Sequence, residues 1–394
     1  MMFQAVLSNP DHPEYGVATI PFPIPRDQYA HCMELLEALE IGDAVKADCQ
    51  VEKIDSFYTV LKRTEMLAVN VEELNYLAKR LDGFDAGEAA QFQAMVHNLE
   101  LFELKDLINL TFCCQQVTVI TDFSDLAAIG RDHYMNLHGG SASVDEMNKL
   151  DGEETARQLI ESGSGTITPY GVVYDNGIKL EQIYDGRFFP CYYYEPNAIT
   201  VAVTSKSEPE DTEHITWLYL PMVQEEIDRA LQRAGITDSA DVRLRMEDTQ
   251  LPDEVDVLLD MEQENLADLN ALAQAADALS TDDMKKLSAV VTMAKPQNAE
   301  QVKNLAENLD LFDFAPGAHT PEEYGKYMIR QSGHFDYDEN LDAFYDYEKY
   351  GTERMNEEDG MFTDRGYIAY KGYTSMEEVM NSGQSSCMEM GGMM

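Results

Sequence analysis

The chain repeats itself along its length. When it is shifted by 195 residues, EELNYLAKRLD (72–82) falls on ADLNALAQAAD (267–277). The same shift superimposes three pairs of glycines without a gap: Gly130 with Gly325, Gly165 with Gly360, and Gly171 with Gly366. Glycine marks positions where the backbone takes a special conformation or approaches another segment closely. The coincident glycines therefore predict one fold used twice in tandem.

The repeat sets the domain boundaries that we predict. Copy one spans 1–195, copy two spans 196–385, and a flexible tail follows at 386–394. Each copy has three parts: a small sheet with one helix, a helical middle, and an end that starts with a helix and finishes in short strands. These parts lie at about 1–66, 67–115 and 116–195 in copy one, and at about 196–260, 261–310 and 311–385 in copy two. The predicted fold class is α+β, with an elongated molecule built from the two copies.

Local signals place individual elements. Strands are predicted from β-branched and aromatic residues in FQAVLS (3–8), GVVY (171–174) and GYIAY (366–370). Helix starts are predicted from side-chain oxygens that precede an acid by three residues, as in a capping box. These pairs are Asn70 with Glu73, Asp85 with Glu88, and Ser280 with Asp283. A further helix is predicted to begin at Thr320, which is followed by proline, and to end at Gly333.

The composition is strongly acidic. The chain has 73 Asp and Glu against 28 Lys and Arg, a formal net charge of -45. Both predicted copies share the excess, with 32 acids against 13 bases in copy one and 40 against 15 in copy two. Such a charge repels nucleic acid and anionic membranes and attracts a cationic protein groove. Solubility or adaptation to high salt is the alternative explanation.

The sequence predicts neither a membrane span nor secretion. It has no run of about 18 apolar residues. The first residues, MMFQAVLSNPDHPEYG, have neither a basic flank nor a long apolar core, so they do not predict a signal peptide. The six cysteines form no CxxC pair, which favours a reducing compartment. We therefore expect a cytoplasmic protein.

Motifs for catalysis, cofactors and metals are absent or incomplete. The chain has no GxxxxGK[ST], GxGxxG or HExxH motif. The best metal candidate, DYDENLDAFYDYE (336–348), matches an EF-hand loop at its first, third and fifth positions. It has Leu341 where that loop needs glycine and Tyr347 where it needs glutamate. We expect no enzyme activity, no catalytic residues, no cofactor and no metal.

An acidic and aromatic stretch stands out in the third part of copy two. Within LDAFYDYEKYG (341–351), Asp342 and Asp346 are four residues apart. On one helix they would share a face and repel each other. The simplest structural interpretation is a helix whose Phe344 and Tyr347 pack inward while its acids face water. That interpretation does not explain why the acids are so many.

Carboxylates continue on both sides of this stretch. The residues that we expect to contact a partner are Asp336, Asp338, Glu339, Asp342, Asp346, Glu348, Glu353, Glu357, Glu358 and Asp359. Only Lys349 and Arg354 offset them within 336–359. Duplex DNA carries one charge for about every 1.7 Å of its axis. A folded surface of closely spaced carboxylates could therefore occupy a DNA-binding groove, and its self-repulsion would be relieved by the partner's Lys and Arg.

These segments resemble the ArdA antirestriction family. The resemblance rests on TPEEYGKYMIRQSG (320–333), on LDAFYDYEKYGTERM (341–355) and on GYIAY, with DYEKYG as the most specific piece. It covers nearly all of copy two and reaches copy one mainly through the internal repeat. Members of the family are acidic, three-part α+β proteins from mobile genetic elements that pair into elongated, curved dimers.

The resemblance implies a non-enzymatic DNA mimic that binds type I restriction-modification enzymes in place of DNA. We expect the chain to occupy the DNA-binding groove of such an enzyme and not to bind nucleic acid or membranes itself. Because the chain carries the unit twice, a homodimer and an intrachain pseudo-dimer both stay open. The alternative partner is another cationic DNA-binding protein, such as a different defence nuclease, a repressor or a nucleoid protein.

The junction between the copies is aromatic and apolar rather than rich in Gly and Ser. It reads RFFPCYYYEPNAIT (187–200). We therefore expect a fixed connection in which Phe188, Phe189 and the tyrosines 192–194 are partly buried.

Overall fold

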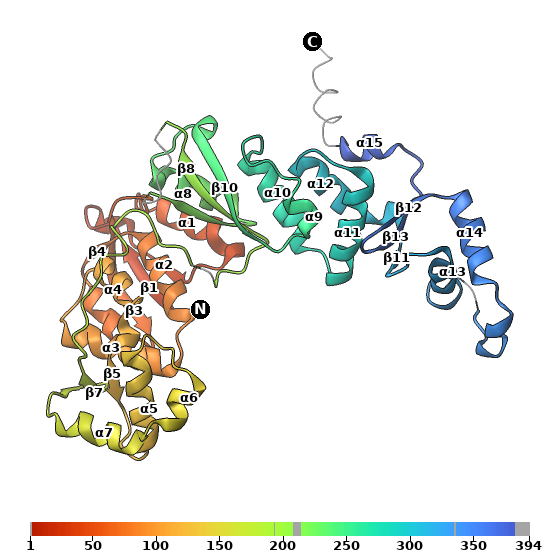
Figure 1. Ribbon diagram of the computed structural model, residues 1–394. Coiled ribbons are helices and arrows are strands. Elements are labelled where there is room, and N and C mark those ends of the chain that lie inside the picture. The colour runs from red at the N-terminus through yellow and green to blue at the C-terminus, as the bar shows by residue number, and fades with distance from the viewer. Residues whose placement is uncertain (1, 193, 208–213, 335, 383–394) are drawn as a thin grey trace, which may run out of the picture. The chain divides into compact units, whose positions relative to one another are not determined.

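The computed structural model describes residues 2–192, 194–207, 214–334 and 336–382, and the fold is mixed α+β, as predicted. The chain forms two compact units (Figure 1). Unit 1 comprises Met1–Tyr194, Asp211–Thr216 and Val223–Ala240, and unit 2 comprises Glu195–Glu210, Trp217–Met222 and Asp241–Met394. These compact units need not coincide with repeated copies, so the boundaries given by the repeat stay a prediction.

Unit 1 begins with a four-stranded antiparallel sheet in the order β2-β1-β3-β4. Its strands are β1 (Phe3–Ser8), β2 (Val17–Phe22), β3 (Cys49–Ser56) and β4 (Ala68–Val69), with helix α1 (Tyr29–Glu37) between β2 and β3 in the chain. FQAVLS forms β1 as predicted. Its Phe3, Ala5 and Leu7 are buried and alternate with more exposed residues, because successive side chains of a strand point to opposite faces.

The middle of unit 1 is helical. Its helices are α2 (Val71–Asp82), α3 (Ala86–Asn98) and α4 (Leu104–Leu110). The predicted caps are confirmed. The Asn70 side chain accepts hydrogen bonds from the backbone N–H groups of Glu72 and Glu73, and Asp85 and Glu88 form a capping box.

The end of unit 1 is a helix pair beside a small sheet of order β5-β7-β6. Its elements are β5 (Thr118–Ile120), α5 (Leu126–Leu137), α6 (Val144–Lys149), α7 (Gly152–Glu161), β6 (Thr166–Thr168) and β7 (Gly171–Tyr174). Helices α5 and α7 approach so closely that a Cβ at Gly130 would lie 1.9 Å from the carbonyl oxygen of Gly152. Only glycine fits at that position without displacing the helices.

Helix α8 (Gln224–Ala234) also belongs to unit 1. Its Arg233 is only 5% exposed and donates to the carbonyl oxygens of Ala44 and Arg187, each at 2.7 Å. A buried guanidinium needs such partners because an unpaired buried charge is strongly destabilising. A truncation near residue 195 would remove a helix that unit 1 packs against, so functional tests require the full chain.

Unit 2 starts with a three-stranded sheet of order β10-β8-β9, followed by helices. The elements are β8 (Ile199–Ser205), β9 (Thr216–Leu220), β10 (Val242–Thr249), α9 (Asp253–Asp256), α10 (Leu266–Asp277), α11 (Thr281–Ala294) and α12 (Ala299–Ala306). The predicted capping box of Ser280 and Asp283 is present at the start of α11.

The end of unit 2 has a sheet of order β11-β13-β12 and a second helix pair. Its elements are β11 (Phe312–Pro316), α13 (Pro321–Arg330), the 3-10 helix η7 (Glu339–Phe344), α14 (Tyr347–Glu357), β12 (Asp359–Thr363), β13 (Gly366–Tyr370) and α15 (Met376–Met380). Thr320 caps α13 as predicted and accepts from the Glu323 N–H at 3.2 Å. The predicted end at Gly333 is wrong: the chain leaves the helix at Gln331, and Gly333, with a φ of 75°, lies in the turn that follows.

The elements follow the same order in the two halves of the chain. The first sheets contain the orders β2-β1-β3 and β9-β8-β10, and the last sheets have the orders β5-β7-β6 and β11-β13-β12. Helices α2 and α10 begin 195 residues apart, at Val71 and Leu266, and strands β7 and β13 do the same, at Gly171 and Gly366. We propose on this basis that the chain carries two copies of one fold.

The aromatic junction is partly buried within unit 1. Phe188 and Phe189 are half-buried and Tyr192 is 8% exposed, as predicted. The same prediction is wrong for Tyr194, which is 80% exposed. Its ring meets Tyr192 edge-on at 5.8 Å between centroids and lines a pocket together with Arg80 and Phe84. Tyr193 and the predicted tail at 386–394 lie outside the described residues.

Candidate acidic binding surface

The acidic region of unit 2, residues 336–359, is supported by the packed helices α13 and α14. A Cβ added at Gly325 would lie 2.0 Å from the carbonyl oxygen of Tyr347, and one at Gly351 would lie 1.8 Å from that of Pro321. Real Cβ contacts are never that short, so both helices need glycine where they face each other. The two backbones are therefore packed in direct contact, which fixes the positions of the side chains on their outer faces.

A small aromatic core lies under the helix pair. Tyr324 and Tyr367 are 3% and 1% exposed, with ring centroids 4.2 Å apart. The Tyr324 hydroxyl donates to Glu358 at 2.6 Å, and burial followed by this hydrogen bond raises the pKa of Tyr324 well above its usual value. The Glu358 carboxylate is thus held by a hydrogen bond from the buried Tyr324 and by an ion pair with Arg354.

The predicted carboxylates are mostly at the surface. Asp342 and Glu358 are half-buried, and the eight exposed ones are Asp336, Asp338, Glu339, Asp346, Glu348, Glu353, Glu357 and Asp359. They lie just before η7, along η7, α14 and β12, and between these elements. Most of the predicted carboxylates are therefore exposed on one segment of unit 2 that contains a 3-10 helix, an α-helix and the start of a strand.

Asp342 has a structural role. Its carboxylate pairs with Arg330 and accepts hydrogen bonds from the hydroxyls of Tyr347 and Tyr337, the latter at 2.7 Å. The bonds from Tyr347, Tyr337 and Arg330 lower the pKa of Asp342 to about 2. Asp342 is therefore already paired with Arg330 inside the chain, and its contact with a partner stays a prediction.

The predicted repulsion between Asp342 and Asp346 along one helix is wrong. Asp342 lies in η7, whereas Asp346 is the N-cap of α14 and accepts from the Lys349 N–H at 3.1 Å. The chain is extended at Tyr345, between the two helices. The break therefore gives Asp346 a helix N-terminus to cap, where a carboxylate stabilises the helix.

The same break corrects the prediction for the aromatic residues. Tyr347 is buried, with 7% exposure, as predicted, but Phe344 is 83% exposed and does not pack inward. A single α-helix over 341–351 would have placed both on one face, since they are three apart. The change from a 3-10 helix to a new α-helix rotates them onto different faces.

Sequence reasoning missed Arg330 and Tyr337 as parts of this site. Arg330 lies twelve residues before Asp342, at the end of a different helix, and its Nε also donates to the Tyr347 hydroxyl at 3.1 Å. No local spacing rule connects residues in separate elements, so the sequence has no signal for this network beyond the presence of one arginine in an acidic region.

Among the described residues, ion pairs involve some of the predicted acids and not others. Glu353 lies 4.0 Å from Lys349, and Glu357 lies 3.9 Å from Arg354. These pairs are exposed and contribute little to stability. No ion pair within the described ranges involves the remaining members of the set, which are Asp336, Asp338, Glu339, Asp346, Glu348 and Asp359.

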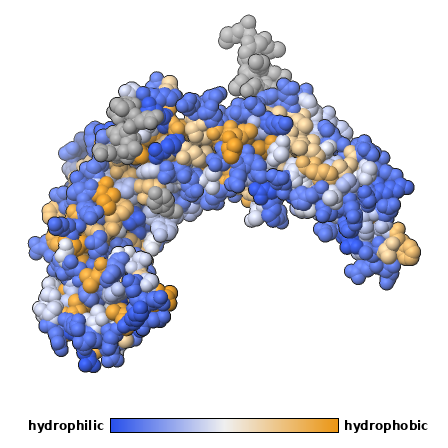
Figure 2. Space-filling view, viewed as in Figure 1, coloured by the Kyte–Doolittle hydropathy of each residue, from blue (hydrophilic) through white to orange (hydrophobic). Residues whose placement is uncertain are grey.

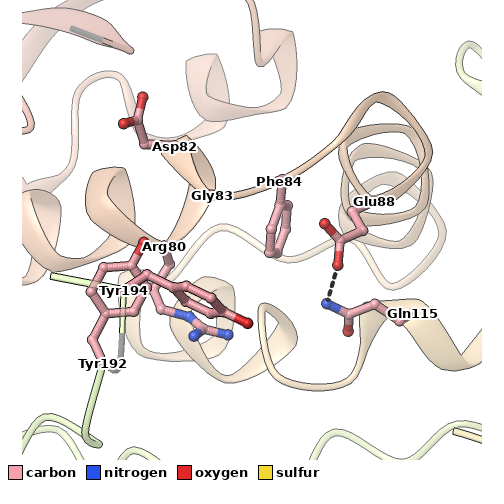
Figure 3. Close-up of a pocket in the computed structure, with 8 residues that line it drawn as sticks. All are labelled: Arg80, Asp82, Gly83, Phe84, Glu88, Gln115, Tyr192 and Tyr194. Atoms are coloured by element: carbon pink, nitrogen blue, oxygen red, sulfur yellow. Dashed lines mark hydrogen bonds between the residues drawn. The ribbon is translucent and has the colours of Figure 1, made fainter. Parts of the chain in front are cut away.

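Unit 1 has a cavity of about 540 Å³, and several of its polar side chains already bond within the protein (Figure 3). Glu88 accepts from the Gln115 side chain at 3.1 Å and from the Asp85 N–H at 3.0 Å. Arg80 donates to the Thr111 hydroxyl at 3.1 Å. The described residues that line the cavity include no serine, cysteine or histidine. Among the described residues, no group of three His, Cys, Asp or Glu could hold a metal ion, and no helix is long and apolar enough to span a bilayer.

The fold and the surface together define an acidic α+β protein with a dense carboxylate region on a rigid helix pair. Residues 212–369 match the model of a family described as Antirestriction protein (ArdA). That range contains β9, α8, the helical middle of unit 2 and all ten predicted carboxylates. Residues 212–369 of the chain are thus similar to the ArdA antirestriction family. A comparison with curated proteins finds no match.

Proposed function

We propose that the chain is an antirestriction protein that mimics DNA and occupies the DNA-binding groove of a type I restriction-modification enzyme. One observation carries this proposal. Eight of the ten carboxylates predicted as partner contacts are exposed within the region that matches the family. Segment 336–359 has ten acids against two bases, a formal charge of -8, and it lies on a scaffold fixed by Gly325 and Gly351.

In the proposed mimicry, carboxylates of this chain replace DNA phosphates as the ionic partners of Lys and Arg in the enzyme. A protein groove that binds duplex DNA presents Lys and Arg to phosphates, and binding releases the counterions condensed on the DNA. Exposed carboxylates held at fixed positions can satisfy the same Lys and Arg. The carboxylates do not copy bases, so inhibition should not depend on the recognition sequence of the enzyme. The mechanism requires binding alone, with no bond made or broken.

Competition with DNA is the direct test. A fluorescent DNA duplex is bound to a type I methyltransferase core, and the full chain is titrated in at several salt concentrations. We expect displacement of the duplex, with an affinity that falls steeply as salt rises. A chain that fails to displace DNA at low salt would exclude this target. A chain that displaces DNA from unrelated cationic proteins equally well would favour the alternative of a general mimic.

A further inference from the structure

Two apolar side chains are exposed in the middle of the acidic region. Leu341 and Phe344 are 49% and 83% exposed, and both lie on η7. A 3-10 helix has three residues per turn, so residues three apart lie on the same face. Figure 2 shows apolar surface surrounded by hydrophilic surface at the connection between α13 and α14. Single exposed apolar side chains are common, so the pair needs further evidence before it is assigned a role.

The first piece of evidence is that η7 is firmly held. Asp342, between the two apolar residues, bonds to Arg330, Tyr337 and Tyr347. The Tyr345 ring lies 6.1 Å from that of Tyr337 and 5.7 Å from that of Tyr347, between centroids. These contacts tie η7 to both α13 and α14. The apolar pair is therefore presented on a braced turn, which reduces the entropy lost when a partner binds it.

The second piece of evidence comes from the corresponding positions of unit 1. At the shift of 195 residues, Leu341 corresponds to Glu146 and Phe344 corresponds to Lys149, both exposed on α6. Arg330 and Asp342 correspond to Met135 and Met147, so the ion pair that holds η7 is missing there too. The apolar pair and its support occur together in the acidic end of unit 2 and are both absent from the equivalent part of unit 1.

We infer that Leu341 and Phe344 form an apolar anchor that enters an apolar depression in the cationic DNA-binding surface of the partner enzyme. The inference rests on the proposed function and deepens it. Its partner is a protein whose groove has both Lys or Arg and apolar side chains. The exposed carboxylates that flank the anchor, Asp338, Glu339 and Asp346, match the sign of such a groove.

DNA itself explains why such a groove would have apolar contacts. Proteins that bind DNA contact the thymine methyl group with apolar side chains, and some insert apolar side chains between base steps. The carboxylates of the mimic then replace phosphates, while the anchor replaces the apolar part of a base. Ionic contacts weaken as salt rises, whereas contact between apolar surfaces does not. Buried aromatic residues are also frequent among the few side chains that dominate protein interfaces.

The test compares two double variants of the full chain in the competition with DNA. L341A/F344A removes the anchor and keeps every charge, whereas D338N/E339Q keeps the anchor and removes two charges. We expect L341A/F344A to lose about tenfold to hundredfold in affinity at every salt concentration, with an unchanged salt slope. We expect D338N/E339Q to lose less affinity at high salt and to have a shallower slope. V144A on α6 is the matched control, because Val144 is 75% exposed and should not affect binding.

The outcomes separate the inference from the proposed function. Because Leu341 and Phe344 are exposed, their loss should leave the thermal midpoint of unfolding unchanged, and this measurement accompanies the titration. If the parent chain displaces DNA and L341A/F344A does so equally well, the anchor is overturned and the mimicry stands. If L341A/F344A changes the salt slope instead of the salt-independent affinity, the anchor is also overturned. If the parent chain does not displace DNA, both proposals fail.

Discussion

In unit 1 a Cβ at Gly130 would lie 1.9 Å from the carbonyl oxygen of Gly152, and in unit 2 a Cβ at Gly325 would lie 2.0 Å from that of Tyr347. These two pairs are separated by the same shift of 195 residues. The helix pairs α5–α7 and α13–α14 therefore pack by the same close contact of backbones. Because glycine permits the approach in both units, the geometry of the scaffold is shared.

The surfaces built on the two scaffolds differ. Segment 336–359 has a formal charge of -8, whereas the corresponding segment 141–164 has six acids against two bases, a charge of -4. Of the ten predicted carboxylates of unit 2, only Asp346 and Glu348 correspond to acids, which are Asp151 and Glu153. Asp151 caps α7 just as Asp346 caps α14. Asp346 therefore has a structural role that both units share, as a helix cap. Most of the other carboxylates of 336–359 have no acidic counterpart in unit 1.

The largest effect is expected at the shared glycines. In a helix, alanine gains about 1 kcal/mol in propensity over glycine, but its Cβ at Gly325 would collide with a backbone carbonyl that cannot move alone. Overpacking of this kind costs about 1–3 kcal/mol, and a contact of 2.0 Å belongs at the upper end. We expect G325A and G130A to destabilise their units by similar amounts in denaturant unfolding. G87A in α3, where the nearest atom is the end of the Asp85 side chain, is the control and should be neutral or stabilising.

Unequal effects of G325A and G130A would contradict the equivalence of the two helix pairs. A large loss for G325A together with a neutral G130A would mean that α5 and α7 can adjust where α13 and α14 cannot. The two scaffolds would then not be equivalent, in spite of their equal spacing in sequence.

The next effect is expected at the ion pair that only unit 2 has. The pKa of Asp342 is lowered to about 2 from an ordinary 3.8, so its ionised form is favoured in the folded state. Its contribution to stability is present above the unfolded pKa and is lost as the pH falls through about 2. We expect D342N to lower the thermal midpoint at neutral pH and to differ less from the parent chain near pH 2, measured by thermal melts across this range.

A double variant tests whether unit 2 needs the ion pair between Arg330 and Asp342. R330M/D342M gives unit 2 the residues that unit 1 has at Met135 and Met147. Removing one partner of an ion pair leaves the other charge uncompensated, whereas replacing both with apolar residues can be close to neutral. We therefore expect the double variant to have a higher thermal midpoint than R330M or D342M alone. A double variant as unstable as the sum of the two single variants would show that the methionines in unit 1 are not an equivalent solution.

The parts of the structure that the sequence predicted are those determined by neighbours in the chain. The caps at Asn70, Asp85, Ser280 and Thr320 follow from side-chain oxygens three residues before an N–H group, and strand β1 follows from alternation. The break at Tyr345 was not predictable in this way. Arg330 reaches Asp342 from another helix. The local pattern of LDAFYDYEKYG instead favoured one continuous helix, which gave the wrong face for Phe344 and wrongly placed Asp342 and Asp346 on the same helix.

A smaller effect is expected at the two equivalent caps. Replacing an N-cap aspartate with alanine costs about 1 kcal/mol, so D346A and D151A should destabilise their units to a similar extent in denaturant unfolding. D346S should keep most of the stability, because serine also caps, while losing the charge. If binding to the partner falls equally in D346A and D346S, the charge of Asp346 contributes to binding. If it falls only in D346A, the cap alone matters.

The smallest effect is expected from single surface acids, and it tests whether the two ends differ in function. Glu348 and Glu153 are exposed and lie at corresponding positions, as the second residues of α14 and α7. Removing one phosphate-like charge should reduce the salt slope of binding by about 0.9, so E348Q should lose about twofold to threefold in affinity for a type I methyltransferase core at low salt. E153Q should be unchanged if only the end of unit 2 contacts the enzyme. Equal losses for E153Q and E348Q would contradict that asymmetry, because a charge in unit 1 would then contribute as much as its counterpart. The partner would in that case contact both units, and the proposed second copy would enlarge the binding surface rather than leave unit 1 in a supporting role.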